Sequence, residues 1–227
     1  MVRWSSIWDG LTDLWLAQRC ALCDRPSPQP PCPSCDQQLQ SCQRQQPPQV
    51  DIEALMVLAW GTYHHTLKRT LAALKYDRHR RLAIPLGQAL GQQWQQHPIP
   101  TRRPPVVVPI PLHGDKLSDR GFNQAALIAA AFCRQTGLPL LAQGLQRQRA
   151  TLPQFGLGPD QRQQNLTDAF TLGAGWQRCP QTQPVLLLDD IYTTGATVRS
   201  AANTLRRAGR SVCGVAVCAR ARLEHDR

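Results

Sequence analysis

Residues 189–197 form the pattern with the most chemical content in this chain. Two adjacent carboxylates are followed by a stretch rich in hydroxyls and small residues, and together these are Asp189, Asp190, Thr193, Thr194, Gly195, Ala196 and Thr197. Hydroxyls and a run of backbone N–H groups at a helix start make a cradle for a phosphate. Two carboxylates would repel a bare phosphate, so we expect a ligand that also presents hydroxyls, as ribose does, or brings Mg²⁺. The pattern predicts a sugar-phosphate site, and its alternative is an ordinary strand–loop–helix connection with a polar helix start.

The flanking residues predict how this pattern is positioned. Residues 185–188 are an uninterrupted apolar run, typical of a strand that is buried on both faces of a parallel sheet. We expect the two carboxylates to end this strand and a helix to run over residues 196–208. Ligands of open α/β sheets bind beyond the carboxyl ends of the strands, so the prediction places the chemistry at that edge.

A second candidate anion site follows the apolar strand predicted over residues 106–111. The next loop offers His113, Lys116, Arg120 and Gly121 before an Ala-rich helix predicted over residues 123–134. Basic groups next to a helix start favour an anion, here a pyrophosphate. The alternative interpretation is a solvated basic loop.

Residues 147–165 are a long, polar, Gly-containing segment, typical of a lid over a site. Its candidate contacts are Arg147, Arg149, Gln154, Arg162 and Asn165. Aromatic residues near the basic loops could stack on bases, although each fits a core position as well; they are Phe122, Phe155 and Tyr192.

Four cysteines near the N-terminus have the spacing of a metal site. Cys20 and Cys23 form one C-x-x-C pair, and Cys32 and Cys35 form a second. Two such pairs can close tetrahedrally around a structural Zn²⁺, which would stabilise a proline-rich loop that cannot build a core of its own. Disulfides or free thiols are the alternatives, and reduced thiols fit a cytoplasmic chain.

The chain divides by composition into two predicted parts. Residues 1–45 contain an amphipathic helix over residues 4–16 and the four-Cys zinc element, a Gln/Pro-rich linker follows over residues 43–49, and residues 50–227 form the main domain. The helix has Trp4, Trp8 and Trp15 on one face, which packs on the main domain or docks on a membrane or a partner. No apolar run is long enough to span a membrane, and no secretory signal is present, so we expect a cytoplasmic protein.

Strand and helix patterns alternate along the main domain. Further strands are predicted over residues 55–60, 140–145 and 212–219, and further helices over residues 67–76 and 80–95. This alternation predicts an α/β fold with a mostly parallel sheet that is covered by helices on both faces.

The charge is strongly positive and unevenly distributed. The chain carries 26 Lys and Arg against 15 Asp and Glu, a net charge of +11. Residues 1–50 have four of each sign, so the whole excess lies on the main domain. A basic domain of this kind suggests a polyanionic partner beyond a single phosphate pocket.

Several motifs together resemble the ComF family of phosphoribosyltransferase-like proteins, also described as competence proteins or amidophosphoribosyltransferase homologues. They are the four-Cys element, Leu74-Lys75-Tyr76, the run 108–113, Arg120-Gly-Phe-Asn-Gln124, the segment 147–165 and Leu188-Asp-Asp with Thr193-Thr-Gly-Ala-Thr197. The resemblance covers nearly the whole chain. One departure is Gly158-Pro159, which stands where a Ser often follows in the lid segment of the family.

The resemblance implies a type I phosphoribosyltransferase fold and specific ligands. Asp189 and Asp190 would hold the ribose hydroxyls of phosphoribosyl pyrophosphate (PRPP), residues 193–197 would wrap its 5′-phosphate, and Mg²⁺ would accompany it. The family further implies a role in DNA uptake during natural transformation, with single-stranded DNA and DNA-uptake proteins at the inner membrane surface as partners.

Two functions therefore stand side by side. In the first, the protein is a PRPP-binding, phosphoribosyltransferase-like protein that handles single-stranded DNA. In the second, it is an active Mg²⁺-dependent phosphoribosyltransferase that transfers the sugar from PRPP to a base or amine and releases pyrophosphate. Lys116 and Arg120 would then stabilise the leaving group, and the lid would exclude water.

Overall fold

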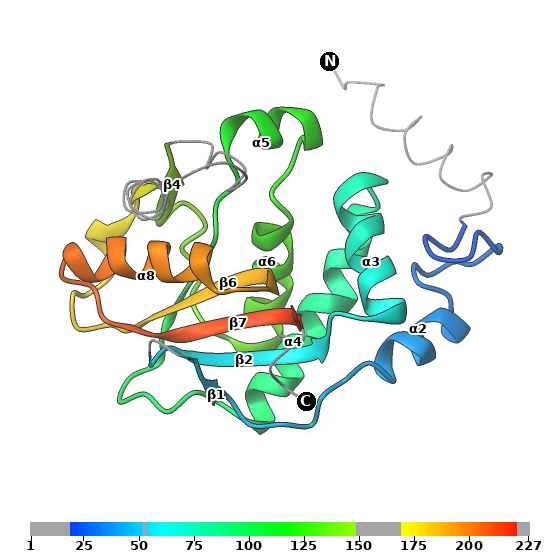
Figure 1. Ribbon diagram of the computed structural model, residues 1–227, viewed down its shortest axis with the longest axis horizontal. Helices are drawn as coiled ribbons and strands as arrows, with labels where there is room; N and C mark the ends of the chain where they lie inside the picture. The colour runs from blue at the N-terminus through cyan, green and yellow to red at the C-terminus, as the bar shows by residue number, and fades with distance from the viewer. Residues whose placement is uncertain (1–18, 52–53, 149–168, 222–227) are drawn as a thin grey trace, which may run out of the picture.

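A five-stranded, mostly parallel sheet lies at the centre of the protein (Figure 1). The computed structural model describes residues 19–51, 54–148 and 169–221. In spatial order the strands are β1 (Gln49–Val50), β2 (Met56–Thr62), β7 (Val212–Arg220), β6 (Val185–Tyr192) and β3 (Val106–Pro109). Only the short edge strand β1 is antiparallel to its neighbour among these five. The predicted parallel α/β sheet is confirmed.

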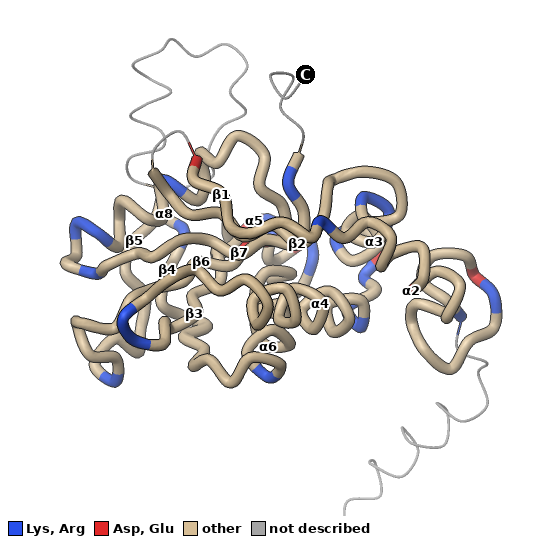
Figure 2. The backbone as a smooth tube through the Cα atoms, turned by 90° about the horizontal axis from the view of Figure 1, so that it is seen from below, with Lys and Arg blue, Asp and Glu red and all other residues tan. Residues whose placement is uncertain are grey.

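Helices cover both faces of this sheet, and Figure 2 shows α8 on one side with α4 and α6 on the other. The helical elements are α2 (Pro33–Gln40), α3 (His65–Tyr76), the 3₁₀ turn η1 (Arg80–Leu82), α4 (Ala83–Gln96), α5 (Gly114–Arg120), α6 (Gln124–Thr136), the 3₁₀ turn η2 (Trp176–Arg178) and α8 (Ala196–Arg207). None of the helices in the described ranges is long and apolar enough to cross a membrane.

The buried strand β6 divides the core into two clusters, because successive side chains of a strand point to opposite faces. Leu186 and Leu188 belong to the cluster under α3, α4 and α6, whereas Val185 and Leu187 belong to the cluster under α8. All four are fully buried, and burying each contributes roughly 1.5–3 kcal/mol. Burial on both faces of the sheet explains why residues 185–188 are all apolar.

A small second sheet lies beside the main one. It pairs β4 (Leu145–Arg147) with β5 (Phe170–Leu172) in antiparallel register. The strand predicted over residues 140–145 is therefore wrong. Leu140 makes a single parallel bridge to Val107, and the chain then turns at Gly144 before β4 begins.

The four-Cys element docks on α3, and the chain behind it is fixed to the main sheet. Arg69 of α3 donates to the carbonyl of Leu22 at 2.6 Å. Gln93, a buried residue of α4, donates to the carbonyls of Arg44 and Gln46. The segment predicted as a linker is thus held by hydrogen bonds from the side chain of Gln93 and by the N–H of Arg44, which donates to the carbonyl of Trp60 in β2. The predicted helix over residues 4–16 lies outside the described residues.

Candidate functional site

The predicted carboxylates lie within a strand and do not end it. Strand β6 continues through Tyr192, and its backbone pairs with β7 on both sides of the carboxylates. Adjacent residues of a strand point to opposite faces, so Asp189 and Asp190 diverge. Asp190 points to the α3–α6 side, where its partners lie, and Asp189 lies on the side of β4. The prediction that the carboxylates end the strand is wrong. It followed from the fact that adjacent acidic residues before a turn commonly stand at a strand end.

Asp190 is buried in a polar network that joins three elements. Its carboxylate oxygen Oδ2 forms an ion pair with the ammonium group of Lys75 from α3, and the two side chains are 5% and 16% exposed. Gln124, in the first turn of α6, donates from Nε2 to Asp190 Oδ1 at 3.4 Å. Arg120 at the end of α5 donates to Gln124 Oε1 at 2.5 Å. The network therefore connects Asp190, which is predicted to hold the ribose hydroxyls, to Arg120, which is predicted to bind pyrophosphate.

Local sequence explains how Gln124 reaches this position. Asn123 caps α6, since its side-chain oxygen accepts from the N–H of Ala125 at 3.0 Å. The amide of Asn123 also donates to the carbonyl of Ile110 at 3.0 Å, which ties the helix start to the end of β3. The start of α6 is thereby fixed beside the carboxyl end of the sheet.

Asp189 has a different environment. Burial, and then the neighbouring charge of Asp190, raise the pKa of Asp189 well above its ordinary value. Arg147 of β4 is close enough to Asp189 for its own pKa to be affected, although burial is the larger cause and lowers it. Perturbed carboxyl groups at the carboxyl edge of a sheet are typical of ligand sites.

The chain segments that follow β3 and β6 run to opposite faces of the sheet. The chain leaves β3 toward α5 and α6, whereas it leaves β6 toward α8 on the opposite face. Open α/β sheets bind their ligands at such a topological switch point. The carboxylates and both predicted anion-binding segments meet there.

The Thr/Gly segment forms a tight turn into α8. Thr193 and Thr194 are exposed, and Gly195 adopts the left-handed conformation with φ of 79° directly before the helix begins. The predicted strand–turn–helix arrangement and the helix at residues 196–208 are confirmed. The hydroxyls of the turn and the N–H groups of the first turn of α8 favour an anion site, which stays a prediction.

Gly195→Ala is expected to destabilise the protein by about 1–3 kcal/mol. An added Cβ would lie 2.2 Å from Tyr192 Oη and 2.3 Å from Arg199 Nη1, in a backbone conformation that favours glycine. Urea unfolding of Gly195→Ala and of Gly137→Ala measures the difference. Gly137 has a φ of 74° but open space around its Cβ position, so equal losses in both variants would contradict the predicted collision.

A charged cluster lies directly beneath this turn. Tyr192 donates its hydroxyl to Asp51 Oδ2 at 2.6 Å, and Arg199 Nη1 lies 3.4 Å from the hydroxyl and 3.5 Å from the carboxylate. Asp51 also accepts from the N–H of Leu55 at 2.8 Å through Oδ1. The cluster therefore joins the Thr/Gly turn to the β1–β2 connection, far away in sequence.

Asp51→Asn is expected to lower the pKa of Tyr192 part of the way from about 12 toward its usual value of 10.0. Burial raises this pKa first, and the hydrogen bond and negative charge of Asp51 raise it further. Because the folded pKa is raised, the unfolded chain loses the proton first, so folding stability falls as pH rises from 10 to 12. Ultraviolet titration of tyrosinate, with Tyr192→Phe to assign the signal, measures the shift. An unchanged titration in Asp51→Asn would contradict the contact.

The second predicted anion segment is a helix instead of a loop. Residues 114–120 form α5, in which His113 caps the start by accepting from the N–H of Asp115 at 3.3 Å, and Gly121 ends it with φ of 75°. Arg120 is brought to the Asp190 network, whereas Lys116 is exposed on α5.

The predicted lid is only partly described. Arg147 lies in β4, whereas Arg149, Gln154, Phe155, Arg162 and Asn165 fall outside the described residues. Two of the three predicted stacking residues are buried: Phe122 is 7% exposed and Tyr192 is 3% exposed. Of the two alternatives for these two rings, stacking on bases or a core position, the structure has the core position.

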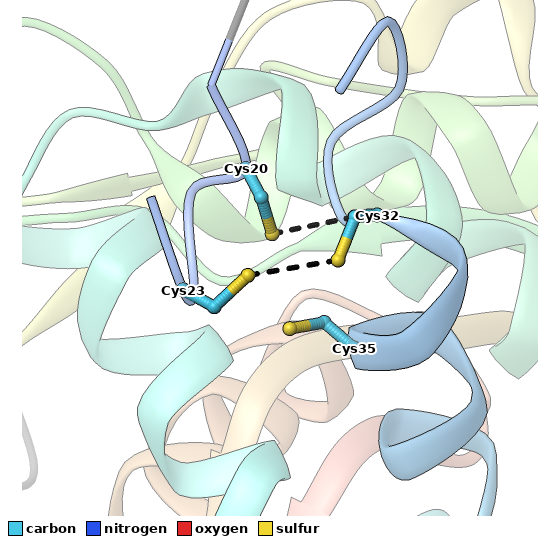
Figure 3. Close-up of side chains that lie close together, drawn as sticks. All are labelled: Cys20, Cys23, Cys32 and Cys35. Carbon is cyan, nitrogen blue, oxygen red and sulfur yellow. Dashed lines mark hydrogen bonds between the residues drawn. The ribbon is translucent and has the colours of Figure 1, made fainter. Parts of the chain in front are cut away.

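The four predicted cysteine ligands converge on one point (Figure 3). All four sulfur atoms lie within 4.8 Å of one another, and Cys42 is not part of the group. The N–H groups of Cys32 and Leu22 donate to Cys20 Sγ at 3.3 and 3.5 Å. Burial raises the pKa of Cys20, but these hydrogen bonds outweigh it and lower the pKa to about 6. A cluster that can hold a metal ion is therefore confirmed.

Lys75, Gln124, Asp51 and Arg199 were not assigned to a site from the sequence. Lys75 and Gln124 lie in motifs that carried the family resemblance, which was the available signal for them. Asp51 had no signal, since its role depends on a contact 141 residues away along the chain.

Comparisons with known proteins identify relatives with competence and DNA-related names. The chain is 29% identical over 191 residues to competence protein F of Haemophilus influenzae, covering 79% of this chain and 80% of that protein. It is 28% identical over 194 residues to DNA utilization protein YhgH of Salmonella typhimurium, covering 84% and 78%. Competence protein ComFC of Bacillus subtilis is 25% identical over 150 residues, covering 66% and 58%. No protein-family model matches.

Comparison with solved structures finds weaker similarities. An adenine phosphoribosyl transferase from Trypanosoma brucei matches with a TM-score of 0.40 and 9% identity, over 81% of this chain and 66% of that one. A glutamine PRPP amidotransferase from B. subtilis matches with a TM-score of 0.37 and 20% identity, over 60% of this chain and 26% of that one. The sequence comparison bears out the resemblance to the ComF family: this chain is similar to the competence proteins F and ComFC and to the DNA utilization protein YhgH.

Proposed function

We propose that this protein binds PRPP, or a related sugar phosphate, and acts in DNA uptake by handling single-stranded DNA in the cytoplasm. The observation that carries the sugar-phosphate part is the switch point between β3 and β6. There the carboxylates of β6, the Thr/Gly turn into α8 and the cation Arg120 converge. The DNA part is supported by the names of the relatives and by the excess positive charge of residues 51–227.

In this proposal the Thr193–Thr197 turn binds the 5′-phosphate and the carboxylates hold the ribose hydroxyls. Asp190 already has Lys75 as its counter-ion, so Asp189 is the better candidate to face a ligand that carries Mg²⁺. Carboxylate oxygens suit this cation, which would supply charge neutralisation for the pyrophosphate. Arg120 and Arg147 supply positive charge for the pyrophosphate. Further predicted contacts of the pyrophosphate are Lys116, Arg149 and Arg162.

The four cysteines hold Zn²⁺ in this proposal, and the geometry supports it. Four sulfur atoms within 4.8 Å of one another, with backbone N–H groups donating to one of them, fit a tetrahedral thiolate site. A four-Cys site leaves no open position for a substrate, so the role is structural. None of the described cysteines is in a disulfide, which fits a reducing compartment.

Calorimetric titration of PRPP, with and without Mg²⁺, tests the sugar-phosphate part. We expect Mg²⁺-dependent binding to the wild type and its loss in Asp189→Asn and Asp190→Asn. Asp24→Asn is the control, because Asp24 is an exposed carboxylate of the four-Cys element. Absence of binding by the folded wild type would overturn the proposal. A screen for pyrophosphate release with bases and amines then tests whether the protein is an active transferase.

A further inference from the structure

The segment that follows α3 is an exposed, basic stretch with an aromatic ring. All six residues from Tyr76 to Arg81 are exposed, and they include three arginines against one aspartate. Tyr76 is 74% exposed. Among the Phe, Trp and Tyr side chains of residues 19–51, 54–148 and 169–221, it is the one that is exposed. A large ring open to solvent is more informative than an exposed aliphatic side chain, because it offers a flat face to a ligand.

Contacts across the molecule place this segment beside the candidate site. Arg78 donates to the carbonyl of Asp119 at 3.2 Å. Arg80 lies over the ring of Phe122, 4.7 Å from its centroid. The segment is therefore packed against the end of α5 and the start of the connection to α6, and it does not extend freely into solvent.

The segment also continues directly from the Asp190 network. Lys75, the counter-ion of Asp190, immediately precedes Tyr76. The guanidinium of Arg120, which bonds Gln124 in that network, lies 5.6 Å from the ring centroid of Tyr76. Tyr76 therefore lies beside the Asp190 network at the candidate site.

We propose that the Tyr76–Arg81 segment is a contact surface for single-stranded DNA, in which a base stacks on Tyr76 and Arg78 and Arg81 face backbone phosphates. This inference deepens the proposed DNA function and rests on it. Single-strand binding surfaces combine positive charge along the backbone with aromatic rings on which bases stack. Tyr76 is exposed and can stack on a base, whereas the rings of Phe122 and Tyr192 are buried and cannot.

Fluorescence anisotropy with a labelled oligothymidylate measures this binding in the full chain at several salt concentrations. We expect Tyr76→Ala to weaken binding about 10-fold or more, and Tyr76→Trp to retain it, because stacking is worth that much per base. Arg78→Gln and Arg81→Gln should each weaken binding and reduce the slope of log affinity against log salt by about 1.

Arg134→Gln and Arg206→Gln are the matched controls. Both arginines are exposed and lie in the last turns of α6 and α8, away from the carboxyl edge. The inference is supported if the controls bind the oligonucleotide like the wild type, while the segment variants bind it more weakly and keep the wild-type melting temperature. Equal losses in controls and segment variants would overturn this surface and leave DNA binding standing. A wild type without affinity for the oligonucleotide would overturn both the surface and the proposed DNA function, while the calorimetric test of PRPP stays independent.

Discussion

Lys75→Met is expected to lower the free energy of unfolding by about 3–5 kcal/mol. Lys75 is the counter-ion of Asp190, and both side chains are largely buried. Removing the ammonium group leaves a buried carboxylate whose remaining partner is the 3.4 Å hydrogen bond from Gln124. The cost of an uncompensated buried charge exceeds the small loss of packing, since Met preserves much of the length of the side chain.

Urea unfolding of Lys75→Met, Asp190→Asn and the double variant measures this coupling as a double-mutant cycle. The double variant should be less destabilised than the sum of the single variants, because it no longer buries an unpaired charge. Lys68→Met is the control on the same helix, where Lys68 is exposed, and it should change stability by about 0.5 kcal/mol or less. A Lys75→Met effect as small as that of Lys68→Met would show that the ion pair contributes little.

Loss of zinc is expected to unfold the four-Cys element. Within this element the buried apolar cluster consists of Cys20, Cys32 and Cys35. This cluster is too small to hold the two C-x-x-C pairs together without a metal ion. Structural zinc sites contribute apparent binding free energies of about 10–16 kcal/mol in small peptides at pH 7, and that energy is folding energy. We therefore expect one zinc ion per chain and loss of order over residues 19–35 when it is removed.

Metal analysis and hydrogen exchange of Cys32→Ser measure both parts of this prediction. Cys42→Ser is the matched control, because Cys42 lies outside the sulfur cluster and should leave the zinc content unchanged. Rapid exchange confined to the four-Cys element in Cys32→Ser, but not in Cys42→Ser, is the expected pattern. Metal-free wild-type protein that keeps slow exchange over these residues would contradict the structural role of zinc.

The sequence by itself determined the elements with strong local signals. The apolar run of β6 has to be buried on both faces, so a central parallel strand followed from composition alone. The Thr/Gly turn had the residues that a helix start requires, and the cysteine spacing predicted a cluster that can hold a metal ion. These features depend on neighbours within a few residues, which is why they could be predicted.

Only the tertiary structure decided which side chains meet. The pleat of β6 sends Asp189 and Asp190 to opposite faces, and Lys75 reaches Asp190 because α3 packs over that edge of the sheet. Asp51 and Tyr192 are paired across 141 residues. Burial of Tyr192 and exposure of Tyr76 likewise depend on which elements cover them. Local patterns fix the type of an element, whereas partners and burial are set by packing between segments that are distant in the chain.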